Sequence, residues 1–209
     1  MRLGLLFAVA CFSPFAVGSI VSTFDTDADG WYLTDVNPAT FLPSGVFAAT
    51  WGAGFGNGGG GLLTADVSNW TWAANTTKFS GDLSAYSGGE VSYDIFIDPG
   101  RDSTPYPLLA IAGVGQVIYT QGIAPDPGSW TTKSHTLAPG DWIYFNGSTN
   151  TPATQGEIDS VLANVVGVFI DVDVLSGLDA HRLDNVSVVP EPSLLAALGM
   201  GILALRRRK

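Results

Sequence analysis

The chain has 209 residues with a formal net charge of −10, and 46% of its residues are hydrophobic while only 13% are charged. A surface this acidic repels phosphate backbones, which excludes nucleic acid as a partner. Cys11 is the only cysteine, so an intramolecular disulfide is excluded and a folded domain must rely on its core or on a bound ion.

The N-terminus has the three parts of a secretory signal peptide. Met1-Arg2 supplies one positive charge, residues 3–15 form an apolar run, and Ala16-Val17-Gly18 is a small-x-small triplet. This order predicts a signal peptide over residues 1–18, cut by signal peptidase to leave Ser19 first. The alternatives are a buried N-terminal strand or helix and a lipoprotein cut before Cys11.

Residues 19–189 read as one domain of short strands. Val91, Tyr93, Ile95 and Ile97 alternate with more polar residues, a period of two that predicts a strand with one buried face. The same alternation runs from Val166 to Val174. Shorter strands are expected at 31–33, 61–66, 108–114, 117–120, 130–137, 142–145 and 183–188, separated by turn-forming Gly, Pro and Asn residues.

One short helix is expected near residue 155. Thr154 and Glu157 have the spacing of a capping box, and Ile158, Val161 and Leu162 follow at helical spacing. The glycine-rich run 56–61 has no phosphate-binding lysine after it, so it is expected to form a flexible surface loop. Regular short strands with one helix favour an all-β sandwich.

The C-terminus predicts a short membrane segment. Residues 193–205 are apolar on every side and are followed by four cations, Arg206, Arg207, Arg208 and Lys209. Thirteen helical residues rise only about 20 Å, so crossing a core of about 30 Å requires snorkelling and local thinning of the bilayer. The cationic end is expected on the cytoplasmic side, with the domain held outside.

Pro190-Glu191-Pro192, the apolar helix and the basic end together resemble the PEP-CTERM sorting signal of biofilm-forming Gram-negative bacteria. The resemblance covers residues 190–209 and implies that an exosortase recognises Pro190, Glu191 and Pro192 and delivers the protein outward. The inner membrane would hold the chain transiently through its C-terminal helix. The released product is expected at the cell surface or outside the cell.

Charge is redistributed when both ends are removed. Residues 19–189 keep four basic residues and eighteen acidic ones, which gives a net charge of −14. Such a body suits cation binding and solubility outside the cell, and a well-solvated secreted domain without a ligand has the same composition.

Several motifs spread over about 160 residues resemble the laminin B (domain IV) module in their order. Phe24-Asp25 and Asp29-Gly30-Trp31 open the set, Lys78-Phe79-x-Gly81-Asp82 lies in the middle, and Leu183-Asp184-Asn185-Val186 closes it. The resemblance implies a jelly-roll, galactose-binding-like β-sandwich related to carbohydrate-binding modules. It carries no catalytic role and implies an extracellular building block.

Asp25, Asp27 and Asp29 stand at alternate positions before a glycine. Calcium prefers oxygen ligands, and this spacing matches the first half of an EF-hand loop. The twelfth position is Val36 instead of glutamate, which excludes an EF-hand. A structural calcium site shared with Asp184 of the last strand is one prediction, and a plain acidic turn is the other.

Catalytic chemistry has little support in the sequence. His135 and His181, the only histidines, lie in no nucleophile or zinc motif, and Glu90 and Glu157 lie in no glycosidase signature. The tryptophans are expected in the core or as sugar-stacking platforms, with Trp72 structural. We expect a non-catalytic surface or matrix protein that holds extracellular polysaccharide, with calcium as a candidate structural ion. The alternatives are a small secreted polysaccharide hydrolase and a structural coat module without a ligand.

Overall fold

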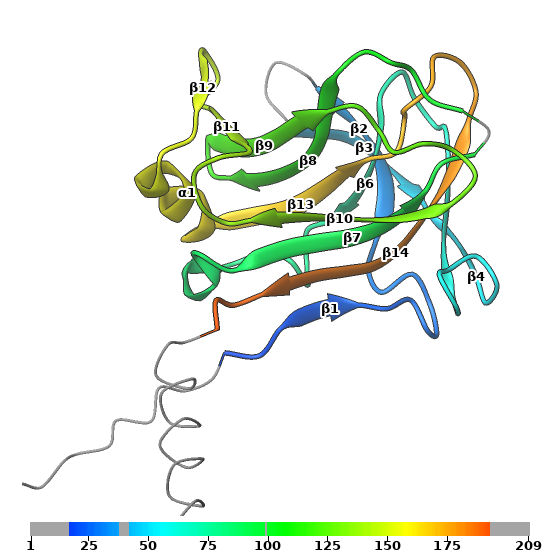
Figure 1. The fold of residues 1–209 in the computed structure, drawn as a ribbon, viewed down its shortest axis with the longest axis horizontal. Coiled ribbons are helices and arrows are strands. Elements are labelled where there is room, and N and C mark those ends of the chain that lie inside the picture. Colours follow the sequence, from blue (N-terminus) through cyan, green and yellow to red (C-terminus); the bar gives the residue numbers. More distant parts are fainter. Residues whose placement is uncertain (1–16, 38–41, 99, 193–209) are drawn as a thin grey trace, which may run out of the picture.

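The computed structural model describes residues 17–37, 42–98 and 100–192, which form a sandwich of two antiparallel sheets with one short helix (Figure 1). The six-stranded sheet has the order β10-β7-β14-β5-β4, with β1 paired to β14, and the eight-stranded sheet has the order β12-β11-β9-β8-β13-β6-β2-β3. The all-β sandwich predicted from strand spacing is therefore confirmed.

The bounds of the elements follow the chain as β1 Ile20–Ser22, β2 Tyr32–Asn37, β3 Leu42–Ala48, β4 Thr50–Gly52, β5 Gly61–Ala65, β6 Thr71–Asn75, the 3-10 helix η1 Ser84–Tyr86, β7 Glu90–Phe96, β8 Tyr106–Gly113, β9 Gln116–Gly122, β10 Trp130–Thr136, β11 Trp142–Phe145, β12 Asn150–Pro152, α1 Gln155–Leu162, β13 Val165–Asp171 and β14 Ala180–Val189.

The main core lies between the two sheets. In β7, Val91, Tyr93 and Ile95 are buried, and Ile97 continues the pattern, so the predicted alternation is confirmed. Leu33 and Trp142 enter the same core from the eight-stranded sheet. Each large apolar side chain that is fully buried stabilises the fold by roughly 1.5–3 kcal/mol, so this core is the main source of stability in a domain without a disulfide.

Helix α1 begins where the capping box predicts. The Thr154 side chain accepts a hydrogen bond from the backbone N–H of Glu157, and the Glu157 carboxylate accepts from the backbone N–H of Thr154 at 2.8 Å. Ile158, Val161 and Leu162 are buried, so the apolar face of the helix packs on the core as expected. This N-terminus is a local motif and was readable without tertiary information.

The glycine-rich run between β4 and β5 packs closely on the N-terminal segment at its buried end. A Cβ atom at Gly60 would lie 2.1 Å from the Phe24 carbonyl oxygen, and one at Gly56 would lie 2.6 Å from Asp184 Oδ2. These glycines therefore permit a close backbone approach at positions where any side chain would clash.

Both ends of the domain meet at one end of the sandwich (Figure 1). β1 pairs with β14 so that Ile20 lies opposite Val188. The Tyr86 hydroxyl donates a hydrogen bond of 2.6 Å to the carbonyl of Gly18. The predicted cleavage junction after Gly18 therefore lies close to the chain segment that leads into Pro190.

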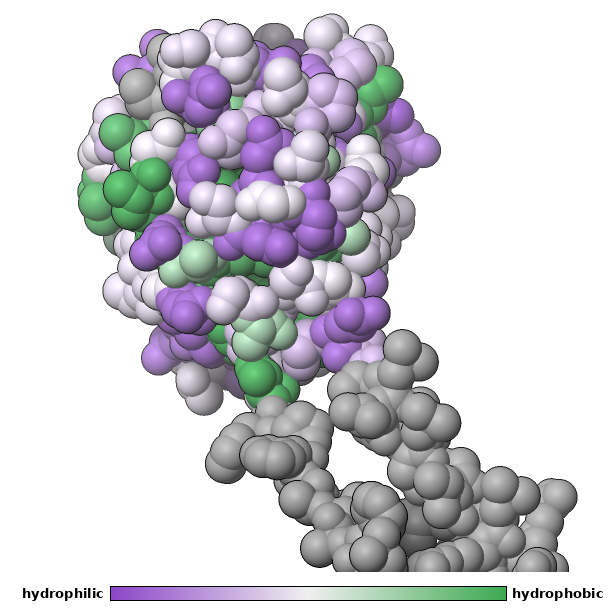
Figure 2. Space-filling view, turned by 90° about the vertical axis from the view of Figure 1, so that its left-hand side faces the viewer, coloured by the Kyte–Doolittle hydropathy of each residue, from purple (hydrophilic) through white to green (hydrophobic). Residues whose placement is uncertain are grey.

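The predicted apolar signal segment, the membrane helix and the basic end Arg206, Arg207, Arg208 and Lys209 lie outside the described residues. Within the part of the chain that the structure describes, no helix is long and apolar enough to cross a membrane. Figure 2 shows the face at the α1 end, where hydrophilic and neutral residues cover most of the surface and apolar residues form small separate patches.

Candidate ligand-binding surface

The outer face of the eight-stranded sheet carries a second apolar cluster. The strand alternation places Leu109 and Ile111 of β8 in the main core, while Ala110 and Ala112 point the other way. This cluster, the outer-face cluster, comprises Val36, Trp72, Ala74, Ala110, Ala112, Val117, Tyr119, Phe145 and Phe169, with Tyr32, Trp70 and Ile143 packed against it. An antiparallel sheet commonly has one solvated face, whereas the nine members of this cluster are at most 9% exposed, so both faces of this sheet carry a buried apolar layer.

In β13, this second apolar cluster changes the alternation of buried and exposed residues that the sequence predicts. The alternation from Val166 predicted one buried face, and Val168 and Ile170 are indeed buried in the main core. Phe169, between them, is also buried, because it belongs to the outer-face cluster. Val166 is instead 37% exposed at the start of the strand.

A pocket of about 470 Å³, the loop-end pocket, opens at the end of the sandwich opposite α1 and the termini. Three chain segments that are distant in sequence line it, at residues 66–70, 102–106 and 173–177. The side chains that matter for its chemistry are two aromatic rings, three carboxylates and an amide: Trp70, Tyr106, Asp66, Asp102, Asp173 and Asn69.

Hydrogen bonds hold the aromatic rings in place. The Tyr106 hydroxyl donates to the carbonyl of Val174 at 2.8 Å, and the Trp70 indole N–H donates to Asp171 Oδ2 at 3.2 Å. Trp70 also packs edge-on against Trp72, with ring centroids 5.1 Å apart. The protein satisfies the polar edges of both rings, and both residues line the pocket.

The pocket carboxylates are also fixed, each through one oxygen. Asp66 Oδ1 accepts a 2.9 Å hydrogen bond from the Thr71 hydroxyl, and Asp173 Oδ2 accepts from the Thr71 backbone N–H at 3.1 Å. Asp102 Oδ2 accepts from the Ser176 hydroxyl at 2.6 Å. The second oxygen of each carboxylate accepts no hydrogen bond from the residues that the structure describes.

Burial and like charges raise three pKa values at this site. Burial, together with the nearby charges of Asp66 and Asp179, raises the pKa of Asp173 to about 6. Asp171 is fully buried behind it, and burial raises its pKa well above the usual aspartate range. Burial and the surrounding carboxylates likewise raise the pKa of Tyr106. The pocket is therefore strongly electronegative.

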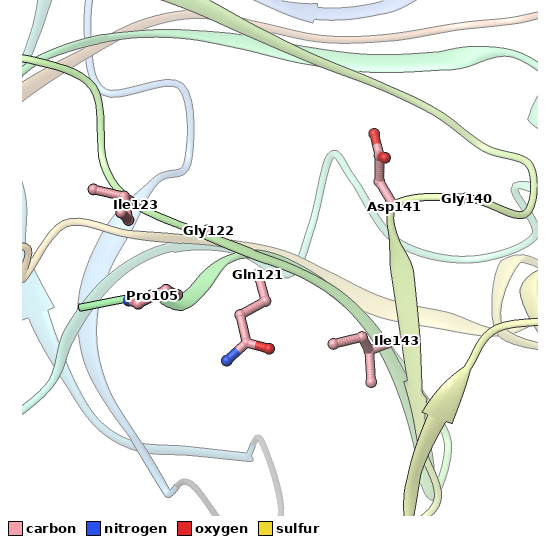
Figure 3. A pocket seen from close by; sticks show the side chains of 7 residues that line it. All are labelled: Pro105, Gln121, Gly122, Ile123, Gly140, Asp141 and Ile143. Carbon is pink, nitrogen blue, oxygen red and sulfur yellow. The ribbon is translucent and has the colours of Figure 1, made fainter. Parts of the chain in front are cut away.

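A wider and shallower hollow of about 780 Å³ lies beside the loop-end pocket. The two are neighbours because Pro105 lines the wider hollow and the next residue, Tyr106, lines the loop-end pocket. Figure 3 shows Gln121 of β9 and Ile143 of β11 on neighbouring strands of this hollow. The Asp141 side chain points away from Gln121, and its Oδ2 lies 3.4 Å from Nδ1 of His135.

The carboxylates predicted to bind calcium have other partners in the structure. Asp29 forms an ion pair with Lys78 and accepts a hydrogen bond from Ser22. Asp27 accepts from the backbone N–H of Asp29, and Asp25 accepts from Thr23. These contacts describe an acidic turn closed by a lysine.

Asp184 lies instead in a polar cluster on the outer face of the six-stranded sheet, opposite Asp94 of β7. Its Oδ2 accepts a 2.7 Å hydrogen bond from the backbone N–H of Asn57. Burial, and after it the charges of Asp94 and Asp25, raise the pKa of Asp184. The structure thus brings Asp25 within electrostatic reach of Asp184, whereas Asp29 is neutralised by Lys78.

Asp94, the neighbour of Asp184 in this cluster, has a lowered pKa. Burial by itself would raise its pKa, but hydrogen bonds from Thr132, Asn185 and Asn57 together lower it. Across residues 17–37, 42–98 and 100–192, no three His, Cys, Asp or Glu side chains form a group that could hold a metal ion. The four predicted ligands are therefore not assembled into one site, and calcium binding stays a prediction of the sequence.

The predicted sorting tripeptide lies at the opposite end from the loop-end pocket. Pro190 and Pro192 line a hollow of about 330 Å³ together with Val189, Thr136 and the segment 88–90. β14 connects the two ends, since it runs from Ala180, beside the pocket loops, to Val189, and ten residues of strand span roughly 30 Å.

Among the five charged and aromatic residues of the loop-end pocket, sequence reasoning offered only Trp70, as one of several candidate sugar-stacking tryptophans, and missed the other four. The signal that could have found them is the alternation after Phe169, where Asp171 and Asp173 take positions on the same face as that apolar residue. Asp102 and Tyr106 carried no local signal, because they become neighbours of Trp70 and Asp173 only through the pairing of β13 with β6 and β8.

Comparison with known proteins matches the fold to an extracellular family and to sugar-binding modules. A family model described as Laminin B (Domain IV) matches residues 71–189, more than half of the chain. The human laminin subunit alpha-1 is 27% identical over 117 residues, which is 53% of this chain but only 4% of the laminin subunit.

Two solved structures share the fold. The L4b domain of human laminin alpha-2 superposes with a TM-score of 0.62 at 14% identity, covering 83% of this chain and 96% of that domain. A family 11 carbohydrate-binding module from Clostridium thermocellum, in complex with a β-1,3-1,4-mixed-linked tetrasaccharide, has a TM-score of 0.53 at 15% identity, covering 84% and 97%.

Proposed function

This chain belongs to the laminin B (domain IV) family, and on that premise we propose that it works outside the cell as a non-catalytic module that binds polysaccharide. The family is characteristic of extracellular proteins, and the same sandwich occurs in a carbohydrate-binding module in complex with a tetrasaccharide. The chain spans only a small part of the laminin subunit that it matches, so the proposal concerns the domain.

The loop-end pocket is the observation that carries the binding role. Sugars are held by aromatic rings that contact their apolar faces and by polar groups that accept hydroxyl hydrogen bonds. Trp70 and Tyr106 supply the rings, and Asp66, Asp102 and Asn69 supply the polar groups. A volume of about 470 Å³ lies within the usual range of ligand pockets, about 300–1,000 Å³.

The position of the pocket fits a protein delivered through its C-terminus. We propose that signal peptidase cuts after Gly18 and that an exosortase recognises Pro190, Glu191 and Pro192. Both processing points lie at one end of the sandwich, and the pocket lies at the other. A tether at the processing end would direct the pocket away from the membrane and toward matrix polysaccharide.

Calcium would have a structural role in this proposal. A cation near Asp25 and Asp184 would offset the like charges that raise the pKa of Asp184. Asp29 would not take part, because Lys78 already pairs with it, and Asp27 is not among the charges that act on Asp184.

A second candidate function is polysaccharide hydrolysis at the same pocket. The observation that favours it is Asp173, whose pKa of about 6 suits a general acid near neutral pH, with Asp66 and Asp102 lining the same concavity. Glycosidases place such carboxyl groups on either side of the bond that is cut. A single assay that follows both binding and hydrolysis of the polysaccharide distinguishes the binding module from the hydrolase.

The test uses the full-length protein and a panel of soluble polysaccharides, with binding followed by affinity electrophoresis and hydrolysis by release of reducing ends. We expect retarded migration with at least one polysaccharide, no reducing ends, and loss of retardation in Trp70→Ala. The matched control is Trp130→Ala, because Trp130 packs on Phe96 on the outer face of the other sheet.

Three outcomes decide between the functions. Equal retardation of Trp70→Ala and wild type, with both folded by circular dichroism, contradicts binding at this pocket. Reducing ends that disappear in Asp173→Asn establish the hydrolase instead. If no polysaccharide retards the protein, the structural coat module without a ligand is the remaining function. Asn69→Ala provides a second pocket variant, in which less of the packing changes.

A further inference from the structure

The loop-end pocket has a charge that its own protein does not neutralise. Among the described residues the ion pairs join Lys78 to Asp29, Arg101 to Asp126, Arg182 to Asp98, and the two histidines to Asp141 and Asp179. None of these pairs includes Asp66, Asp102 or Asp173, the three carboxylates that line the pocket.

Donors inside the protein form hydrogen bonds with only one of the two oxygens of each of these carboxylates. Thr71 and Ser176 supply neutral hydroxyl or backbone donors to one oxygen of each carboxylate. These donors are neutral, so they leave the negative charge of the carboxylates uncompensated. The second oxygens are therefore available to a ligand that brings N–H donors and positive charge.

An unpartnered buried atom lies directly behind the pocket wall. The Asp179 side chain is fully buried, and its Oδ1 has no hydrogen-bond partner among the described residues. Its Oδ2 accepts from the backbone N–H of Leu175, and its carbonyl accepts from the backbone N–H of Asp66, both of which line the pocket. A buried carboxylate oxygen without a partner is costly, and a cation in the pocket would lower that cost.

The aromatic rings define the rest of the ligand. Trp70 and Tyr106 lie with the carboxylates in one concavity, so a ligand that fits must place positive charge and apolar C–H surface close together. A cation near an aromatic face gains a further attraction, and a sugar ring presents a flat C–H face to the same surface. Ca²⁺ supplies the charge without the apolar surface, and no metal-holding group occurs among the described residues.

We infer that the loop-end pocket selects polysaccharides that carry protonated amino sugars, with the ammonium group held by Asp66, Asp102 and Asp173 and the sugar ring against Trp70 and Tyr106. This inference rests on the proposed polysaccharide-binding function and names its ligand class. The net charge of −14 on residues 19–189 adds a long-range attraction for such a cationic polymer and repels acidic ones.

The test is isothermal titration of the full-length protein with a β-1,4-linked glucosamine hexamer. Its fully N-acetylated counterpart and the neutral glucose hexamer of the same linkage are the matched ligands, because they keep the ring and lose the charge. Spermidine supplies amine charge without a sugar ring, and calcium chloride supplies a divalent cation alone. We expect the glucosamine hexamer to bind at least about tenfold more tightly than either neutral hexamer, with an affinity that falls as salt is added.

Variants assign the binding to this pocket. Asp102→Asn keeps the acceptor for Ser176 and removes one charge, and we expect it to weaken binding of the glucosamine hexamer about two- to fivefold. Asp66→Asn combined with Asp102→Asn should weaken it about tenfold. The control is Asp82→Asn, which removes the same charge from an exposed turn beyond the other end of β6 and should leave the affinity unchanged.

The outcomes separate this inference from the proposed function. Equal binding of the neutral and cationic hexamers overturns the amino-sugar selectivity and leaves polysaccharide binding in place. Spermidine binding as tight as that of the hexamer overturns the role of the rings. Equal effects of Asp82→Asn and Asp102→Asn show attraction by net charge alone and overturn the site. Binding of calcium in place of any hexamer overturns both this inference and the glycan role of the pocket.

Discussion

His181 and Asp179 are buried together, with Nε2 of His181 2.8 Å from Oδ2 of Asp179 and both side chains fully shielded from solvent. Nδ1 of His181 accepts a hydrogen bond from the backbone N–H of Asp98 at 3.0 Å, so a neutral His181 carries its proton on Nε2 and donates it to Asp179. One histidine thereby connects the loop after β7 to the loop before β14. These two loops form part of the end of the sandwich where the loop-end pocket opens.

Replacing His181 by alanine should destabilise the fold strongly. The substitution leaves the Asp179 carboxylate buried without its side-chain partner, and breaking a buried pair in this way costs about 3–5 kcal/mol. Urea denaturation of the full-length protein measures the change. His135→Ala is the control, because His135 and Asp141 form a longer and more exposed contact, and a similar loss in both variants would contradict the special role of the buried pair.

Asp173 predicts a pH dependence of stability with a defined sign. Its folded pKa of about 6 lies above the ordinary value of 3.8, so folding favours the protonated form. The destabilisation by its charge is fully present above pH 6 and is relieved as the pH falls from about 6 toward 4. Because the side chain is partly solvated, we expect an effect of roughly 1–2 kcal/mol.

Asp173→Asn isolates this contribution. The variant should be more stable than wild type at about pH 7.5, and the difference should vanish near pH 4, as measured by the urea midpoint at each pH. The charges of Asp66, Asp179 and His181 act on Asp173, and all three residues remain in the variant. A pH-independent difference between variant and wild type would contradict the raised pKa.

The glycine run between β4 and β5 offers a steric test. A Cβ atom at Gly60 would lie 2.1 Å from the Phe24 carbonyl oxygen and 3.0 Å from Trp51 Nε1, so Gly60→Ala must displace backbone. We expect a loss of about 2 kcal/mol or more in the free energy of unfolding. Gly59→Ala is the matched neighbour, since its Cβ would be 3.7 Å from Asp25 Oδ1, an ordinary contact. Equal stabilities would show that the loop does not close on Phe24.

Calcium binding is tested by melting the full-length protein with calcium and with chelator. If calcium binds near Asp25 and Asp184, two of the four ligands that the sequence predicts, saturation at about 100 times the dissociation constant stabilises the fold by about 2.7 kcal/mol. Asp184→Asn should remove that gain, and Asp27→Asn should keep it, because Asp27 bonds to the Asp29 backbone instead. An identical melting temperature in calcium and in chelator would contradict a calcium site in this domain.

Local sequence patterns predicted a large part of the fold. The alternation in β7 and the capping box of α1 involve residues within one element, and each has the predicted structure. The strands β3 and β6 were not predicted. Trp72-Ala73-Ala74 shows no polar alternation because both faces of β6 are buried, one in each apolar cluster, and β3 is an exposed edge strand without a buried face to pattern.

The sequence by itself determined the strand-rich body, its acidity, the capped helix and the family motifs, because each depends on composition or on neighbours within a few residues. Only the tertiary structure decided which carboxylates share a site. It placed Asp173 beside Asp66 and Asp102 and kept Asp29 with Lys78. The physical reason is that strand pairing brings together groups about 100 residues apart, and neither their burial nor the charge around them is encoded locally.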